Sequence, residues 1–201
     1  MDIPMADDSG WDRLVPRRRR WNVVESLCRR IGAQLAVELG VFRGATVRHL
    51  LANLPDLHVI AVDTWMPGCP EFEPDAAVKR TPDDSGYRSY ADVDLEEAYA
   101  GVLQIAREYV PRCHVWRMDM LRAAESVEPR SVDLVFHDAD HTTTALATAI
   151  RAWLPAIRPG GIVAGHDVNM PSVRLALDRL CPTIRCEHDS TWWVPAEEVR
   201  A

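Results

Sequence analysis

The chain has 201 residues and a mass of 22.6 kDa, with 47% hydrophobic and 26% charged residues, which suits one globular α/β domain. Its net charge of −7 argues against a broad nucleic-acid-binding surface, and no apolar run approaches the roughly 20 residues that span a bilayer. The five cysteines are odd in number and never form a C-x-x-C pair, so we expect a reduced, cytoplasmic protein without a zinc knuckle.

The N-terminal part of the chain predicts a flexible leader followed by a helix. Residues 1–19 form the expected leader. The arginine run 17–20 spans its end, and we interpret it as a solvated approach to the first helix, with contact to phosphate or an acidic partner as the alternative. From Trp21 onward apolar residues recur at helical spacing until Gly32 ends the pattern. Residues 20–201 are therefore expected to form a single domain.

The next stretch, 35–51, predicts a buried strand that turns sharply into a helix. An aliphatic run ends in Glu38, and Gly40 and Gly44 follow it. Glycine lets the backbone turn tightly and approach a ligand closely, with the N–H groups of the new helix nearby. A buried, unpaired Glu38 would be costly, so we expect it to meet a cationic or hydroxylated group of a ligand. The alternative is an ordinary tight turn of an α/β protein.

A second apolar run, 57–63, predicts a parallel strand that ends in Asp63. This acid lies 19 residues after Gly44, where a carboxylate can accept hydrogen bonds from a ribose diol. Glu38, Gly40, Gly44 and Asp63 together resemble the cofactor-binding half of class I S-adenosylmethionine-dependent methyltransferases. The resemblance implies that the two glycines approach the methionine part of S-adenosylmethionine and that Asp63 holds its ribose.

The irregular stretch 64–92 predicts either an active-site lid or disorder. It is rich in proline, glycine and acids, so no regular helix or central strand can run through it. As a lid it would offer Trp65, Tyr87 and Tyr90 as substrate or cofactor contacts. An amphipathic helix follows over 95–109, before Pro111.

A third strand is expected at 113–116, followed by Met118 and Asp119. In methyltransferases that this chain resembles, an acid just after the third strand accompanies the adenine, which makes both residues cofactor candidates. The alternative is that Asp119 only caps a short helix over 120–127.

Two polar clusters follow the next two predicted strands. The fourth strand, 132–136, leads into His137-Asp138-Ala139-Asp140-His141, and the fifth, 162–164, leads into Gly165-His166-Asp167. A helix with apolar residues from Leu146 to Ile157 lies between them, and Thr142 can cap its start. Neighbouring parallel strands present their carboxyl ends at the edge of the sheet where ligands bind in doubly wound folds, so we expect both clusters in one site.

The spacing of these clusters resembles that of catechol O-methyltransferase-like and macrolide-sugar O-methyltransferase enzymes, which bind a metal. The resemblance implies metal ligation by Asp138, His166 and Asp167, with Asp138 serving catalysis and His141 as the base near the acceptor hydroxyl. A histidine stands at the middle position, where these families usually have a carboxylate. Magnesium prefers oxygen ligands, so His166 shifts the preference toward manganese or another transition metal, or leaves the site metal-free.

The tail completes the expected fold. A helix from Pro171 precedes two strands over 183–187 and 191–194, and this closing hairpin resembles the end of class I methyltransferases. Trp192 and Trp193 alternate across a strand, so one can be core and the other exposed as a substrate wall or dimer contact, but we favour core packing. The predicted architecture is a Rossmann-like, doubly wound, mostly parallel seven-stranded sheet with helices on both faces and a C-terminal antiparallel hairpin.

The sequence therefore predicts an S-adenosylmethionine-dependent methyltransferase, with O-methylation of a small hydroxylated molecule such as a sugar or natural-product intermediate. A divalent metal such as magnesium or manganese, a histidine base, or both would assist. We expect a small-molecule substrate, no membrane, no nucleic acid, and a homodimer as one oligomeric option. The alternatives are a metal-dependent phosphohydrolase that uses the two His-Asp pairs and a non-catalytic nucleoside-binding module. The missing middle glycine disfavours a dehydrogenase.

Overall fold

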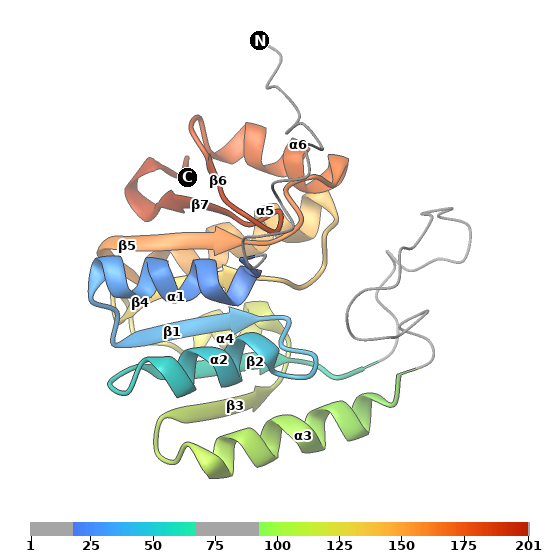
Figure 1. Cartoon of the computed structure of the whole chain (residues 1–201). Coiled ribbons are helices and arrows are strands. Elements are labelled where there is room, and N and C mark those ends of the chain that lie inside the picture. The colour runs from blue at the N-terminus through green and yellow to red at the C-terminus, as the bar shows by residue number, and fades with distance from the viewer. Residues whose placement is uncertain (1–17, 67–92, 201) are drawn as a thin grey trace, which may run out of the picture.

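The computed structural model describes residues 18–66 and 93–200. A seven-stranded sheet runs through its centre in the order β3-β2-β1-β4-β5-β7-β6 (Figure 1). The strands are β1 (Leu35–Leu39), β2 (His58–Asp63), β3 (Cys113–Arg117), β4 (Val132–His137), β5 (Ile157–Gly165), β6 (Arg185–Cys186) and β7 (Trp192–Pro195). Strands β1 to β5 are parallel, while β7 pairs antiparallel with both β5 and β6. The predicted doubly wound sheet with a closing antiparallel hairpin is confirmed.

Helices cover both faces of the sheet. They are α1 (Arg20–Ile31), α2 (Ala45–Asn53), α3 (Leu95–Glu108), α4 (Met120–Glu125), α5 (Thr143–Trp153) and α6 (Pro171–Leu180). Apolar residues of α1, α2 and α3 pack on one face and those of α4, α5 and α6 on the other, so the chain has two core layers (Figure 1). Among the described residues, no helix combines the length and apolar character needed to cross a bilayer.

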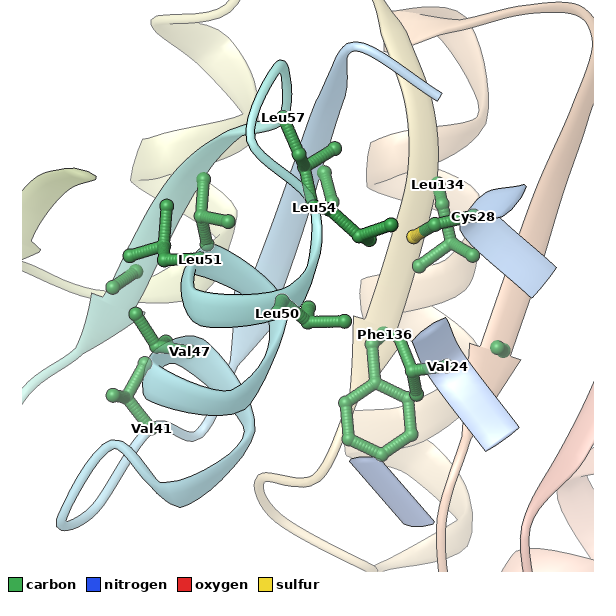
Figure 2. Close-up of a cluster of buried hydrophobic side chains, with 14 of the residues drawn as sticks. Val24, Cys28, Val41, Val47, Leu50, Leu51, Leu54, Leu57, Leu134 and Phe136 are labelled. Carbon is green, nitrogen blue, oxygen red and sulfur yellow. The ribbon is translucent and has the colours of Figure 1, made fainter. Parts of the chain in front are cut away.

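The strands are apolar on both sides because each face is covered. In β4, for example, Leu134 and Phe136 belong to the first layer, while Val135 belongs to the second. Figure 2 shows the first layer, where Val24 of α1 and Leu50 of α2 approach Phe136. Each of these three side chains is at most 2% exposed. Burying a side chain of this size contributes about 2 kcal/mol, so this packing fixes α1 and α2 against the sheet.

Two expectations about element boundaries were wrong. The helix predicted to extend to Ile157 ends earlier, and Ile157 instead begins β5. This strand includes Pro159-Gly160-Gly161, and its pairing with β4 changes register between Val132 and Leu134. The strand over 183–187 is limited to Arg185–Cys186. Trp192 and Trp193 are both buried, as core packing predicts, and Arg30 and Arg185 cover the ring of Trp193.

The expected leader and lid fall mainly on residues 1–17 and 67–92, which lie outside the described residues, as do Tyr87 and Tyr90. Trp65 is described and is not available as a lid contact. Its side chain is 2% exposed, packs beside Tyr99, and donates its indole N–H to the carbonyl oxygen of Phe42 at 2.8 Å. It therefore supports the turn that follows β1.

Gly101 in the middle of α3 offers a test of the helix. A Cβ built on Gly101 would meet nothing within 4 Å, so alanine fits without a clash. Because alanine loses less backbone entropy than glycine in a helix, Gly101→Ala should raise the free energy of unfolding by about 0.5–1 kcal/mol. Urea unfolding followed by circular dichroism measures this change. A loss of stability would mean that residue 101 is not in a regular, open helical position.

Candidate active site

The candidate site lies where β1, β4 and β5 end. Register pairs Leu39 with His137 and His137 with Gly165, so the three strands finish side by side. Backbone hydrogen bonds continue past the strand ends: the Asp138 N–H donates to the Leu39 carbonyl at 2.8 Å, and the His166 N–H donates to the His137 carbonyl at 3.1 Å. The two polar clusters predicted from sequence are thereby brought together.

Two carboxylates and two imidazoles form the centre of this site. Asp167 Oδ2 lies 3.0 Å from His141 Nε2 and 3.2 Å from His166 Nδ1. Asp138 Oδ1 lies 3.5 Å from the same His166 nitrogen and 3.9 Å from His141 Nε2. All four side chains are largely buried, and Asp167 has a left-handed backbone with φ of 59°. Backbone strain of this kind is common at functional sites and indicates that the position of Asp167 is tightly determined.

Neighbouring charges in the cluster shift the pKa values of His166 and Asp167. Burial alone would lower the pKa of His166, but Asp138 and Asp167 outweigh it and raise that pKa to about 10. Burial works in the opposite direction on Asp167, yet His141 and His166 hold its pKa well below the usual range. At neutral pH His166 is therefore protonated and Asp167 is ionised, so the cluster carries both signs of charge.

His137 stands apart from this cluster although it precedes Asp138. Its side chain is 3% exposed, and its Nε2 has no hydrogen-bond partner among the described residues. Burial lowers the pKa of His137 to about 4, with His141 adding to the decrease, so the ring is neutral at pH 7. His137 ends β4 and His141 precedes α5, so the two imidazoles do not lie on one helix.

Glu38 at the end of β1 is a buried acid that faces the same site. It is 3% exposed, and its Oε2 has no hydrogen-bond partner in the described part of the chain. Burial, followed by the charge of Asp138, raises the pKa of Glu38 to about 8, while Arg20 and Thr46 oppose this rise. Such an unsatisfied buried carboxyl group fits the expectation that it meets a ligand.

Asp63 has a structural role that the sequence did not predict. Its Oδ2 accepts the backbone N–H groups of Val41 and Phe42, both at 2.9 Å, and its Oδ1 accepts that of Trp65 at 2.8 Å. These bonds hold the turn between β1 and α2. A carboxylate can accept about four hydrogen bonds, so these three leave one acceptor position on Asp63.

Two acidic residues, Asp119 and Asp140, accept backbone N–H groups at the starts of helices. Asp119 caps α4, since its Oδ1 accepts the N–H groups of Leu121 and Arg122 at 2.9 and 3.2 Å. Asp140 accepts the N–H of Thr142 at 2.8 Å, and Thr142 in turn caps α5 as expected. Met118, beside Asp119, is 37% exposed. These contacts establish the capping alternative for Asp119 and leave the proposed adenine contacts of Met118 and Asp119 as predictions.

Arg20, at the start of α1, is the site residue that the sequence analysis missed. Its Nε lies 2.9 Å from Asp138 Oδ2, and its backbone N–H donates to Asp189 Oδ2 at 2.9 Å. The arginine run had been interpreted as a solvated leader, with an acidic partner as the alternative. That acidic partner lies within the chain itself, 118 residues away.

A cavity of about 700 Å³ lies at the other end of the strands. Its lining includes His58, His114, Asp133 and Arg158, which lie near the amino-terminal ends of their strands. The carboxylate of Asp133 is already occupied by Arg158 and by the N–H groups of Gln34 and Leu35. The main charged group of this cavity is thus already paired, and the cluster of Asp138, His141, His166 and Asp167 is at the opposite edge of the sheet.

Comparison with known proteins identifies the family to which this architecture belongs. A family model described as a methyltransferase domain matches residues 37–168, which run from β1 to just beyond Asp167. The chain belongs to this methyltransferase family. The matched residues include Glu38, both turn glycines and the polar cluster of the methyltransferase, whereas α1 and the closing hairpin lie outside the match. No curated protein matches the methyltransferase in sequence.

Solved structures share the fold of the methyltransferase at low sequence identity. A protein provisionally named an O-methyltransferase from Klebsiella pneumoniae is 18% identical, with a TM-score of 0.58 over 98% of this chain and 84% of that one. Cofactor-bound Rv0187 from MTB is 16% identical, with a TM-score of 0.58 over 92% and 83%. Spermidine synthase from Thermotoga maritima is 13% identical, with a TM-score of 0.55 over 89% and 60%.

These findings make the protein a class I S-adenosylmethionine-dependent methyltransferase, as the sequence predicted. The non-catalytic alternative is wrong, because the family is one of enzymes. The neighbours also include a synthase, which illustrates that a shared fold does not by itself determine the acceptor.

Proposed function

We propose that this methyltransferase transfers a methyl group from S-adenosylmethionine to a hydroxyl oxygen of a small molecule. The observation that carries the proposal is the cluster of two carboxylates and two imidazoles beside the turn after β1. O-methylation requires an oriented hydroxyl group and a group that takes its proton. Asp138 and Asp167 supply the charge that orients a cation or hydroxyl, and His141 beside them supplies the proposed proton acceptor.

The cofactor would bind over the turn between β1 and α2. Gly40 and Gly44 allow the backbone to approach its methionine part, and both have left-handed backbones with φ of 85° and 74°. The unsatisfied Glu38 carboxyl group suits the ammonium or sulfonium charge of the cofactor, which would favour the ionised form. Asp63 has one acceptor position left for the ribose, and Met118 and Asp119 are proposed beside the adenine.

The donor set fits a divalent cation. Ligand atoms of Asp138, His141 and Asp167 all lie within 4.8 Å of one another, which suits ligation of one ion. His166 Nδ1, the ligand expected from sequence, lies against the same two carboxylates. Two oxygens with one imidazole nitrogen favour manganese, iron or zinc over magnesium. A bound cation would lower the pKa of an acceptor hydroxyl and orient it.

The chain's own residues then position the acceptor and accept its proton. Either imidazole lies close enough to the two carboxylates to complete the ligand set. We assign this position to His166, as predicted from the sequence, which leaves His141 to take the hydroxyl proton. The acceptor oxygen attacks the methyl carbon in line with the sulfur, so that the O–C bond forms as the C–S bond breaks. S-adenosylhomocysteine and the methylated acceptor are the products, and most of the rate enhancement comes from positioning.

The phosphohydrolase alternative has less support in the site. It needs two His-Asp pairs, His137-Asp138 and His166-Asp167, acting together. His137 makes no ion pair with the cluster among the described residues and is neutral at pH 7, so only the second pair contributes both members.

Calorimetric titration with S-adenosylhomocysteine tests the proposal. We expect micromolar binding, roughly −8 kcal/mol, in chelator and in manganese alike, followed by methylation of hydroxylated compounds in an acceptor screen. His141→Asn and His166→Asn assign the imidazoles: loss of the ligand lowers manganese affinity, whereas loss of the base lowers the rate with manganese affinity retained. Absence of S-adenosylhomocysteine binding under both conditions would contradict the proposed cofactor, and methylation of nitrogen alone would contradict the acceptor class.

A further inference from the structure

Arg20 places a positive charge directly against one of the candidate metal ligands. The two oxygens of Asp138 face different partners: Oδ2 lies 2.9 Å from Arg20 Nε, while Oδ1 faces His141 and His166 at 3.9 and 3.5 Å. The Arg20 side chain is 31% exposed and that of Asp138 is 13% exposed, so the pair is only partly screened by water. Asp138 therefore carries a counter-ion supplied by the chain before any other cation arrives.

Two further contacts, one with Asp189 and one with Trp21, hold Arg20 in place. Its backbone N–H donates to Asp189 Oδ2, in the turn between β6 and β7, and its guanidinium lies 5.6 Å from the centre of the Trp21 ring. A cation at the first residue of a helix is unfavourable, because the helix dipole places partial positive charge there. The carboxylates of the site offset this cost, because Arg20 contacts Asp138 and its charge opposes the rise in the pKa of Glu38.

A guanidinium keeps its charge at every pH that a protein tolerates, so this counter-ion cannot be removed by deprotonation. A divalent cation bound by Asp138 and Asp167 would lie close to a like charge. Coulomb repulsion over such a distance, in partly buried surroundings, amounts to about a tenfold change in affinity or more. Arg20 is thus expected to weaken cation binding at this site.

We propose that Arg20 is the resident counter-ion of Asp138 and competes electrostatically with a divalent cation for the site. The inference rests on the proposed metal-assisted function and assigns a part of that site to α1, which lies outside the residues matched by the family model. Arg20 is a positioning residue in this scheme, since it acts through Asp138.

The test is a manganese titration of the chelator-treated full-length protein, with free Mn²⁺ followed by electron paramagnetic resonance. Arg20→Gln should bind Mn²⁺ about tenfold more tightly than the wild type, and Arg20→Met should show the same gain. Arg20→Lys keeps the charge and should stay within about threefold of the wild type. Arg48→Gln is the matched control, because its ion pair with Glu108 is exposed and belongs to α2 and α3.

The competition is overturned if the neutral variants bind Mn²⁺ no more tightly than the wild type, if Arg20→Lys gains as much as they do, or if no variant binds Mn²⁺. Circular dichroism of each variant verifies folding, and the two neutral side chains provide a second opportunity if one variant does not fold. S-adenosylhomocysteine titration of the same samples separates the two proposals. A wild type that does not bind it contradicts the methyltransferase site, whereas binding without an effect of Arg20 contradicts the counter-ion alone.

Discussion

Gly40→Ala should cost at least about 3 kcal/mol of unfolding free energy and abolish S-adenosylhomocysteine binding. A Cβ at this position would lie 2.3 Å from the Asp138 carbonyl oxygen and 2.7 Å from the Ala139 Cα. These are backbone atoms at the end of β4, so they cannot move aside as a flexible side chain can. The φ of 85° adds strain for any residue with a Cβ. Urea unfolding and calorimetry measure the two effects.

Gly32→Ala is the control for this variant. Gly32 also has a left-handed backbone, with φ of 60°, but a Cβ there would meet nothing within 4 Å. The Gly32→Ala variant should lose only about 1 kcal/mol of unfolding free energy, which is the strain of the left-handed conformation alone. It should bind S-adenosylhomocysteine as the wild type does. Equal losses in the two variants would show that the contact between Gly40 and Asp138 has no energetic weight.

Glu38→Gln should stabilise the chelator-treated protein progressively as the pH rises from about 4.5 to about 8. The pKa of Glu38 is raised to about 8 in the folded state, chiefly by burial and then by Asp138. Over this range the folded state holds a proton that the unfolded state releases, so the wild type loses stability with rising pH. Glutamine cannot ionise and avoids that loss, which reaches on the order of 4 kcal/mol above pH 8.

Thermal or urea unfolding of both proteins at several pH values gives the difference in their unfolding free energies. The contributions of the other ionisable groups cancel in this difference, because these groups are present in both proteins. Glu97→Gln, at an exposed position of α3, serves as the control and should follow the wild-type pH dependence. A constant difference between Glu38→Gln and the wild type from pH 5 to 9 would contradict the raised pKa.

The fold was predictable from sequence because its signals are local. Continuous apolar runs mark strands covered on both faces, and Gly32, Thr142 and Pro171 mark helix ends that the structure confirms. The start of β5 was not predictable in this way. Pro159-Gly160-Gly161 has the composition of a turn, and only pairing with β4 keeps this segment in the sheet.

The candidate site was predictable to the extent that it follows strand ends. Parallel strands had to bring Asp138, His141, His166 and Asp167 to one edge, and they do. The partners of Arg20 and Asp63 were not accessible, because they depend on how α1 and the turn after β1 pack against distant residues. A run of arginines or an acid at a strand end contains no signal of which atoms it will meet.

The tight fit of Gly40 against Asp138 and Ala139 has a consequence for how the site is filled. It joins the turn proposed to bind the cofactor to the segment that carries the acidic cluster, with no side chain between them. If occupation of one segment shifts the other, the two binding equilibria are linked, and linkage is reciprocal. Any factor by which S-adenosylhomocysteine changes manganese affinity must equal the factor by which manganese changes S-adenosylhomocysteine affinity.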